Sequence, residues 1–302
     1  FWVLLSLTGS RLGRFLFFAL RHHHLLRAFW PLVVAATWPA GFRARSLAAR
    51  RPPLLRVAPG AANDAPAAER GFQGYEVRAQ RFRFSEEPGP GAEGAVLEVQ
   101  VPQVLHLQYG MYVWPCAVVL AQYLYLWFHR KSLPGTEGLE IGAGVSLPGI
   151  LAAKCGAEVT LSDNSELPRS LEICRHSCQI NSLSEVHIVG VTWGHISPDL
   201  LALPPQDIIL ASDVFFEPED FEDILITVYF LMEKNPKVQL WSTYQVRSAD
   251  WSLEALLYKW DMKCAQVPLE SFEADKEGLA ESALPGRHTI EMLIISSAKG
   301  SP

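Results

Sequence analysis

The stretch LEIGAGVSLPGILAAKCG, residues 139–156, places Gly142 and Gly144 between an apolar run and a segment with helical spacing. A glycine-rich turn from a strand into a helix lets the backbone approach a ligand closely, with the helix N-terminus behind it. The dinucleotide fingerprint G-x-G-x-x-G needs a third glycine where this chain has Leu147. The turn therefore predicts a bound ligand, but it departs from the pyrophosphate-binding pattern at a defining position.

Two acidic residues flank this turn at the ends of predicted strands. Glu140 would repel a phosphate, but it could accept hydrogen bonds through water from an amino-acid ammonium group. Asp163 follows 23 residues later, near the spacing of about 20 residues that is typical of an acid binding ribose hydroxyls. S-adenosylmethionine carries the ammonium group and the ribose without a phosphate, so the sequence predicts it as the cofactor.

Short apolar runs alternate with amphipathic stretches beyond Pro134, which predicts a parallel, doubly wound α/β sheet. The last two strand-like runs, Met262–Val267 and Thr289–Ser296, are joined by a polar loop, which predicts an antiparallel edge. The other predicted strands are 138–141, 158–162, 186–189, 207–211 and 238–243, and the predicted helices are 147–155, 167–181, 219–234 and 251–260.

Residues 1–70 differ in composition from the rest of the chain. They contain ten Arg, no Lys and two acidic residues, a composition that fits a transit peptide or a translated GC-rich leader ending in a Pro- and Ala-rich linker. No uninterrupted run of about 18 apolar residues indicates a membrane span. We expect 1–70 to be disordered and to pack little against a domain at 71–302, in which a hairpin (71–108, strands 75–84 and 95–101) precedes a core (109–297). A helix is predicted to begin near Pro115.

Charge and cysteine content narrow the classes of partner. The chain has a net charge of −6 and residues 1–70 carry +8, so the remainder carries −14. An acidic domain suits a basic protein substrate better than direct nucleic-acid binding. The five cysteines are odd in number and form no C-x-x-C pair, which favours a reducing compartment. Cys174 and Cys178 could form half a metal site, but no second ligand pair accompanies them, so we expect buried thiols and no metal.

Five motifs carry a resemblance to a known family: YVWPCAVVLAQYL, LEIGAGVSLPGILAAKCGA, LSDNSE, TWGH and DIILASDVFFEPEDF. Over residues 109–297 the chain resembles the seven-stranded class I methyltransferases of the methyltransferase-like group that modify proteins. The resemblance implies a Rossmann-like, mostly parallel doubly wound sheet with an antiparallel edge and an N-terminal β-hairpin lead-in. It also implies S-adenosyl-L-methionine as cofactor.

The resemblance places the cofactor's methionine and ribose along the glycine turn, its adenine at Trp193 and its methionine end at Trp114. Both tryptophans could instead be ordinary core residues. Ser146 replaces a family glycine, which is tolerable if the position needs no positive φ. Residues 136–138 (Thr136, Glu137, Gly138) replace an apolar run, so we expect a short first strand and reduced stability. The implied cofactor-binding residues are Trp114, Glu140, Gly142, Ala143, Gly144, Ser146, Asp163, Trp193 and Ser212.

The motif SDVFFEP is expected at the carboxyl end of the fourth strand, beside the methyl group to be transferred. Aromatic faces favour cationic or planar guanidinium groups, and the carboxylates of Asp213 and Glu217 could orient an arginine. Alternatively, the phenylalanines are core residues and Asp213 caps the next helix. Tyr244, after the fifth strand, is a second candidate. The predicted catalytic residues are Asp213, Phe215, Phe216 and Glu217.

The acceptor follows from the resemblance alone, which implies an arginine in a histone H3 tail, a role in transcriptional and chromatin regulation, and a location in nucleus and cytoplasm. Chaperone or transcription-factor partners cannot be read from the sequence. Two alternatives stay open: a lysine acceptor, because many relatives methylate lysine, and a methyltransferase-fold protein that binds a partner with little catalysis. A nicotinamide dehydrogenase is a distant third, because the phosphate loop is wrong.

Overall fold

The computed structural model describes residues 75–85, 96–104, 108–131, 135–248, 253–286 and 288–300. All of them belong to one compact unit, 71–302. The expectations for residues 1–70 lie outside the described residues and stay predictions. Among the described residues, no helix is both long enough and apolar enough to span a bilayer.

A seven-stranded sheet in the order β5-β4-β3-β6-β7-β9-β8 forms the centre of this unit. Its first five strands are parallel neighbours, and β9 runs antiparallel to both β7 and β8. The sequence-based prediction of a mostly parallel, doubly wound sheet with an antiparallel edge is thereby confirmed. The strands are β3 (Glu137–Glu140), β4 (Glu158–Asp163), β5 (His187–Gly190), β6 (Ile208–Ser212), β7 (Gln239–Gln245), β8 (Met262–Val267) and β9 (Ile290–Ser297).

The central strand β3 is short, with four residues, and few of them are apolar. Gly138 pairs with Val159 on β4 and with Ile208 on β6. The backbone N–H of Glu137 donates to the Asp207 carboxylate at 3.1 Å. Backbone pairing on both sides therefore holds a strand in which Leu139 is the one apolar side chain, and the expected shortness is confirmed.

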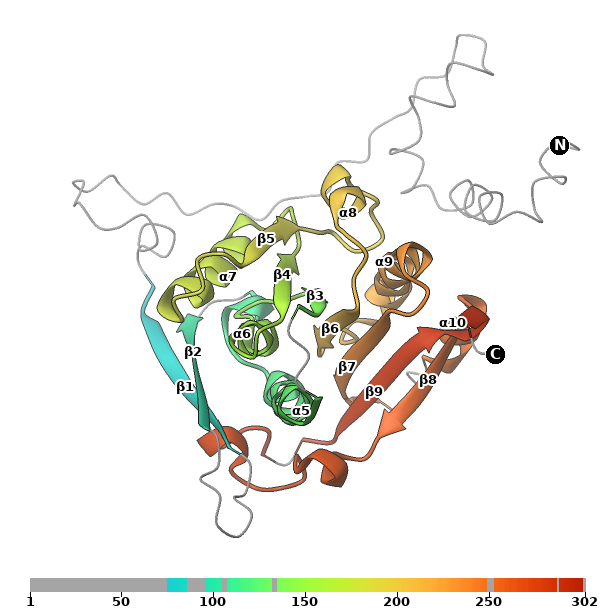
Figure 1. The fold of residues 1–302 in the computed structure, drawn as a ribbon. Helices are drawn as coiled ribbons and strands as arrows, with labels where there is room; N and C mark the ends of the chain where they lie inside the picture. The colour runs from blue at the N-terminus through green and yellow to red at the C-terminus, as the bar shows by residue number, and fades with distance from the viewer. Residues whose placement is uncertain are drawn as a thin grey trace, which may run out of the picture. The chain divides into compact units, whose positions relative to one another are not determined.

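Helices cover both faces of the sheet (Figure 1). One face is covered by α5 (Pro115–Lys131), α6 (Leu147–Lys154) and α7 (Pro168–Ile180). The opposite face is covered by α8 (Pro198–Ala202), α9 (Phe221–Lys234) and α10 (Glu254–Lys259). The predicted helix 219–234 begins as a 3-10 turn, Pro218–Asp220, and α8 was not predicted because its five residues give no helical periodicity. The helix predicted near Pro115 begins at that residue.

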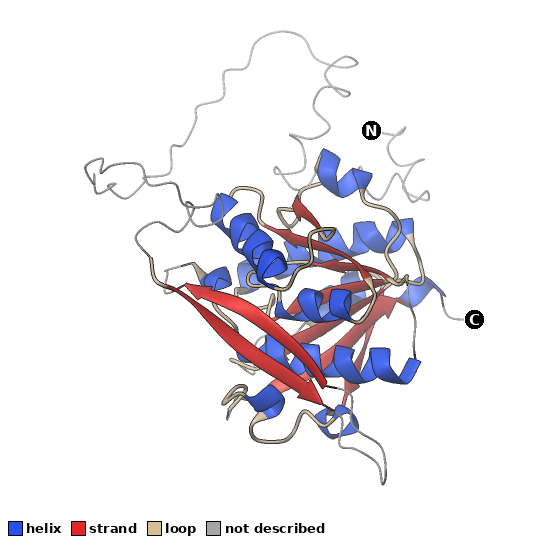
Figure 2. Cartoon of the chain, turned by 60° about the vertical axis from the view of Figure 1, so that its left-hand side comes forward, coloured by secondary structure: helices blue, strands red, loops and turns tan. Residues whose placement is uncertain are grey.

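The predicted hairpin is present as β1 (Val77–Ser85) and β2 (Val96–Val104), paired antiparallel outside the central sheet. Figure 2 shows it in front of the helices. The side chain of Asn181, just beyond α7, accepts from the backbone N–H of Gln100 at 3.1 Å and donates to its carbonyl at 2.5 Å. Lys154 donates to the Glu98 carbonyl at 2.8 Å. Polar side chains thus pair with the edge of β2 and attach the hairpin to the helical layer.

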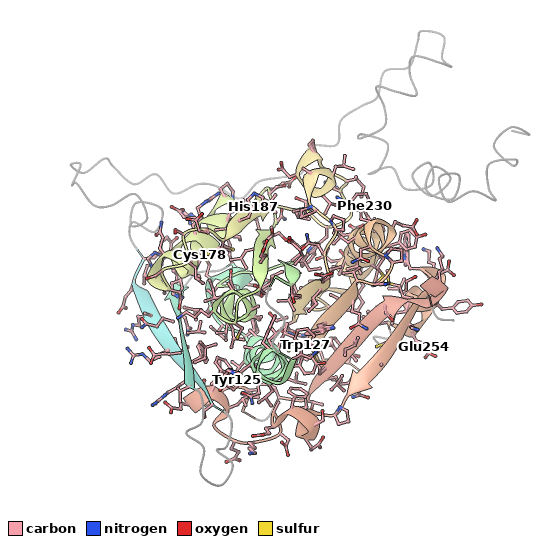
Figure 3. The ribbon with its side chains drawn as sticks, viewed as in Figure 1. Tyr125, Trp127, Cys178, His187, Phe230 and Glu254 are labelled. Carbon is pink, nitrogen blue, oxygen red and sulfur yellow. The ribbon has the colours of Figure 1, made fainter. Side chains whose placement is uncertain are left out.

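Helix α5 lies between the hairpin and the sheet, and two aromatic residues mark its two sides (Figure 3). Tyr125 is fully buried, with its ring 6.1 Å from that of Phe84 on β1. Trp127 packs edge-on at 4.8 Å against Trp241 on β7. Because both sides are buried, α5 is apolar nearly all round, as a helix between two layers must be.

Candidate active site

The predicted site lies where β3 and β6 end, next to each other in the sheet. The strand order reverses direction between these two strands, and open α/β sheets bind ligands outside the carboxyl ends at such a point. A side chain at Gly142 would meet the ring of Trp193 at 2.9 Å and Val214 at 3.1 Å. The glycine turn, the segment after β5 and the segment after β6 therefore meet at one place.

The turn needs left-handed backbone at three positions: φ is +61° at Gly142, +51° at Gly144 and +61° at Ser146. The first two are glycines, which adopt this conformation without a steric penalty. Ser146 adopts it at a cost of about 1 kcal/mol or more. Serine was expected to be tolerated only without a positive φ, and Ser146 has one. The glycine that the family has at this position would adopt this conformation without strain.

Helix α7 holds the turn from behind. The Cys174 thiol donates to the Gly144 carbonyl at 3.2 Å, and the Ser177 hydroxyl donates to the Val145 carbonyl at 2.8 Å. The backbone N–H of Ala143 donates to the Ser162 carbonyl at 2.9 Å. Cys174 and Cys178 are both buried, and the described residues contain no group of three or more side chains that could hold a metal ion. Cys174 thus acts as a support of the turn.

The two predicted acids lie on either side of the turn, close to its backbone. Glu140 is buried, and its Oε2 accepts from the N–H of Gly149 at 3.0 Å. Asp163 is half-buried, and its Oδ2 accepts from the N–H of Gly144 at 2.9 Å. Burial raises the pKa of Glu140 to about 8, with Asp163 adding and the Gly149 N–H opposing. Burial likewise raises the pKa of Asp163, against the N–H groups of Gly144 and Asn164.

Replacing Glu140 with glutamine is expected to flatten the pH dependence of the unfolding free energy. A raised pKa means that the folded protein favours the neutral form of Glu140. Its contribution to the unfolding free energy is therefore full below the ordinary pKa of 4.5 and is lost as the pH rises to about 8. The expected loss is on the order of 1 kcal/mol per pH unit in that window. Urea unfolding of both proteins between pH 5 and 8 measures it. Parallel pH profiles for the two proteins would contradict the assignment.

An aromatic rim, formed by Tyr109, Tyr112, Trp114 and Phe216, borders the turn. The ring of Tyr109 lies 5.4 Å from Phe216 and 6.1 Å from Trp114, and Tyr112 lies 5.1 Å from Trp114. Trp114 Nε1 donates to the Tyr109 carbonyl at 2.8 Å, and Tyr109 is 55% exposed. Sequence reasoning found Trp114 and Phe216 but missed both tyrosines. No sequence signal marked the two tyrosines, because their place depends on the contact of Gly110, next to Tyr109, with Gly144 of the turn.

The residues after β6 separate into core and rim. Phe215 is fully buried and packs edge-on against Phe221 at 5.4 Å. This corrects the expectation that both phenylalanines line the site: Phe215 belongs to the core and Phe216 to the rim. Glu217 is exposed on the loop that follows, and Ser212 is half-buried at the end of β6.

Asp213 is buried and has φ +55°. Its carboxylate does not cap the next helix: Oδ1 and Oδ2 accept from Nη1 and Nη2 of Arg247 at 2.8 and 2.6 Å. Tyr244 is buried nearby on β7, and its hydroxyl has no hydrogen-bond partner among the described residues. The Asp213 carboxylate, just after β6, therefore pairs in bidentate geometry with a guanidinium group, that of Arg247.

The residues present fit S-adenosylmethionine. Glu140 Oε1 is buried without a hydrogen-bond partner among the described residues, which suits an acceptor for an ammonium group. The two glycines leave no room for a side chain at the turn. Trp193 is fixed against the turn because the next residue, Gly194, donates its N–H to Thr227 of α9 at 2.9 Å. When bound, this cofactor supplies a methyl group on a sulfonium, already activated for in-line transfer.

Comparison with known proteins agrees with this geometry. Residues 96–253 match the family model described as lysine methyltransferase. The chain is 74% identical over 238 residues to the mouse histone-arginine methyltransferase METTL23, covering 79% of this chain and 92% of that one. The human protein of the same name is 82% identical over 191 residues, 63% of this chain and 100% of that one. The mouse protein N-lysine methyltransferase METTL21A is 33% identical over 134 residues, 42% of this chain and 58% of that one.

With its glycine turn, paired acids and sheet topology in place, the chain belongs to the lysine methyltransferase family and is an S-adenosylmethionine-dependent protein methyltransferase.

Proposed function

We propose that the chain methylates an arginine in a basic protein tail, most specifically that of histone H3. The carrying observation is the buried Asp213 carboxylate, whose two oxygens accept hydrogen bonds from both Nη atoms of a guanidinium, here that of Arg247. Planar, bidentate pairing of this kind suits arginine, whereas lysine offers a compact point charge. The high identity to relatives named histone-arginine methyltransferases supports the same acceptor.

The surroundings of Asp213 suit a cationic guest. The aromatic rim can attract a cation through its ring faces. The −14 charge of residues 71–302 favours a basic partner and disfavours direct binding of nucleic acid. The proposal includes a role in chromatin regulation, because histones are chromatin proteins, and a location in the nucleus and cytoplasm.

Catalysis in this proposal rests mainly on positioning. The sulfonium already carries a good leaving group, so the residues of the chain have to align a guanidinium nitrogen and accept its proton. Asp213 would orient the guanidinium, the aromatic rim would hold its plane, and the buried surroundings would exclude water. Phe215 supports the loop from the core.

Lysine is the second candidate acceptor, because the matching family is described as lysine methyltransferase and a more distant relative is named an N-lysine methyltransferase. Mass spectrometry of histone H3 incubated with the full chain and isotopically labelled S-adenosylmethionine separates the two. We expect label on arginine. Label found only on lysine would refute the arginine assignment while leaving the fold, cofactor and reaction class intact.

A further inference from the structure

One guanidinium of this chain already binds the Asp213 carboxylate just after β6. Arg247 pairs with Asp213 through both Nη atoms, and the Arg247 side chain is 24% exposed while that of Asp213 is 4% exposed. The fork-shaped donors of arginine match the two carboxylate oxygens, which makes this the strongest geometry for such a pair. The two partners therefore differ: the acid is enclosed and the base reaches it from the solvent side.

Asp213 is fixed in place by its backbone neighbours. Its N–H donates to the Thr243 carbonyl at 2.8 Å, and its Oδ1 accepts from the N–H of Gln245 at 3.3 Å. Its neighbour Val214 lies against Gly142 of the cofactor turn. The carboxylate is thus a built feature beside the turn.

A buried carboxylate needs a cationic partner, because removing its counterion leaves an uncompensated charge. Arg247 supplies that partner. Oδ1 of Asp213 accepts one hydrogen bond from Arg247 Nη1 and a second from the backbone N–H of Gln245. A substrate guanidinium requires the same two oxygens. The two cations cannot both pair bidentately with Asp213 at the same time.

The buried hydroxyl of Tyr244 gives a second, independent observation. It has no hydrogen-bond partner among the described residues, and it belongs to the residue between Thr243 and Gln245, whose backbones both hydrogen-bond to Asp213. Burial raises the pKa of Tyr244, Arg247 opposes this shift, and the acids Glu291 and Asp213 add to it. A buried polar atom without a partner needs an explanation, and a ligand bound near Asp213 would supply one.

We propose that Arg247 is an internal competitor, which holds the guanidinium site on Asp213 until an arginine of the substrate replaces it. This inference rests on the proposed arginine acceptor. The exchange conserves the ion pair, since one guanidinium leaves as another arrives, so the acid is never left buried without a cation. A guest without a guanidinium gains less from the exchange, so the competition also favours arginine.

The competition has a kinetic signature. If Arg247 occupies the site for most of the time, the apparent affinity for substrate equals the intrinsic affinity multiplied by the small fraction of molecules in which the site is open. The Arg247→Ala variant is expected to show a KM for an arginine-containing H3 peptide that is about three- to tenfold lower, and a kcat/KM higher by the same factor. An unchanged or higher KM would mean that Arg247 has only a structural role and would overturn the proposal.

A stability measurement tests the site without any substrate. Arg247→Ala is expected to lower Tm, and millimolar methylguanidinium is expected to restore part of that loss, whereas methylammonium is not. Arg247→Gln, which is shorter and uncharged but keeps a side-chain NH2 donor, serves if the alanine variant does not fold. The matched control is Arg81→Ala, because Arg81 pairs with Glu98 at 3.2 Å on the surface, with both side chains exposed.

The outcomes are distinct. A methylguanidinium shift in Tm that is larger for the Arg247 variants than for wild type and Arg81→Ala supports the site, and equal shifts in all of them overturn it. Rescue by methylguanidinium together with label found only on lysine would overturn the arginine acceptor and the competition while the guanidinium site stands. Failure of the proposed function is thereby separated from failure of the site.

Discussion

Replacing Gly144 with valine is expected to abolish cofactor binding, lowering affinity for S-adenosylmethionine at least 100-fold, or about 2.7 kcal/mol. Gly144 has φ +51°, and a Cβ there would lie 2.9 Å from the Gly110 carbonyl oxygen and 3.0 Å from the Gly110 Cα. Both contacts are to backbone, which cannot rotate away. The N–H of Gly144 also donates to the Asp163 carboxylate at 2.9 Å, so moving the turn also displaces Asp163, the acid predicted to bind the ribose. Isothermal titration calorimetry of the full chain measures the loss.

The control for this variant is Gly156→Val. Gly156 also has positive φ, +93°, but a Cβ there meets nothing within 4 Å. It lies between α6 and β4, away from the turn. Both variants therefore suffer the left-handed strain of a β-branched residue, about 1–3 kcal/mol, and only one meets a backbone clash at the cofactor. If Gly144→Val, shown to be folded by circular dichroism, binds the cofactor as well as Gly156→Val does, the turn is not the cofactor site.

The architecture was predictable because its signals are local. Alternating apolar runs and amphipathic stretches identify the strands and helices, and the glycine turn marks where one becomes the other. The closeness of Glu140 and Asp163 could be predicted because two consecutive parallel strands end at the same edge of the sheet. These inferences depend on neighbours in the sequence, and the sheet confirms them.

The site was less predictable, because its details depend on backbone conformation and on distant partners. Nothing in the sequence pair Phe215–Phe216 says which ring turns inward after β6. The left-handed φ of Ser146 is set by packing of the turn against α7. The pairing of Asp213 with Arg247 joins residues 34 apart in the chain, and no pattern in the sequence links them.

The position of Glu140 also follows from packing. Its place at the end of a strand suggested a carboxylate open to ligand, but one oxygen is bound to the first turns of α6 through Gly149. A Cβ at Gly149 would clash with that oxygen. Gly149 therefore makes room for the Glu140 side chain. This explains the glycine at position 149, which cofactor binding at the turn does not by itself require.

Replacing Asp213 with asparagine is expected to lower kcat/KM for methyl transfer to an arginine peptide at least 100-fold while cofactor affinity stays within about tenfold, or about 1.4 kcal/mol. An amide keeps the shape of the side chain, but it loses the charge and one of the two acceptors that a guanidinium pairs with. The cofactor turn keeps its own hydrogen bonds to α7 and Asp163. Steady-state kinetics with labelled cofactor, together with calorimetry, measure the two quantities separately.

Asp213→Asn also leaves Arg247 without its carboxylate, so a lower Tm is expected, and cofactor binding shows whether the variant is folded. The matched control is Asp207→Asn, which makes the same chemical change next to the opposite end of β6, where Asp207 accepts from the N–H of Glu137. The control is expected to retain transfer within about threefold, because Asp207 is exposed and lies at the opposite end of β6 from Asp213. Transfer by Asp213→Asn at the level of Asp207→Asn would make the Asp213–Arg247 pair purely structural and would remove the basis for both the acceptor assignment and the competition at this site.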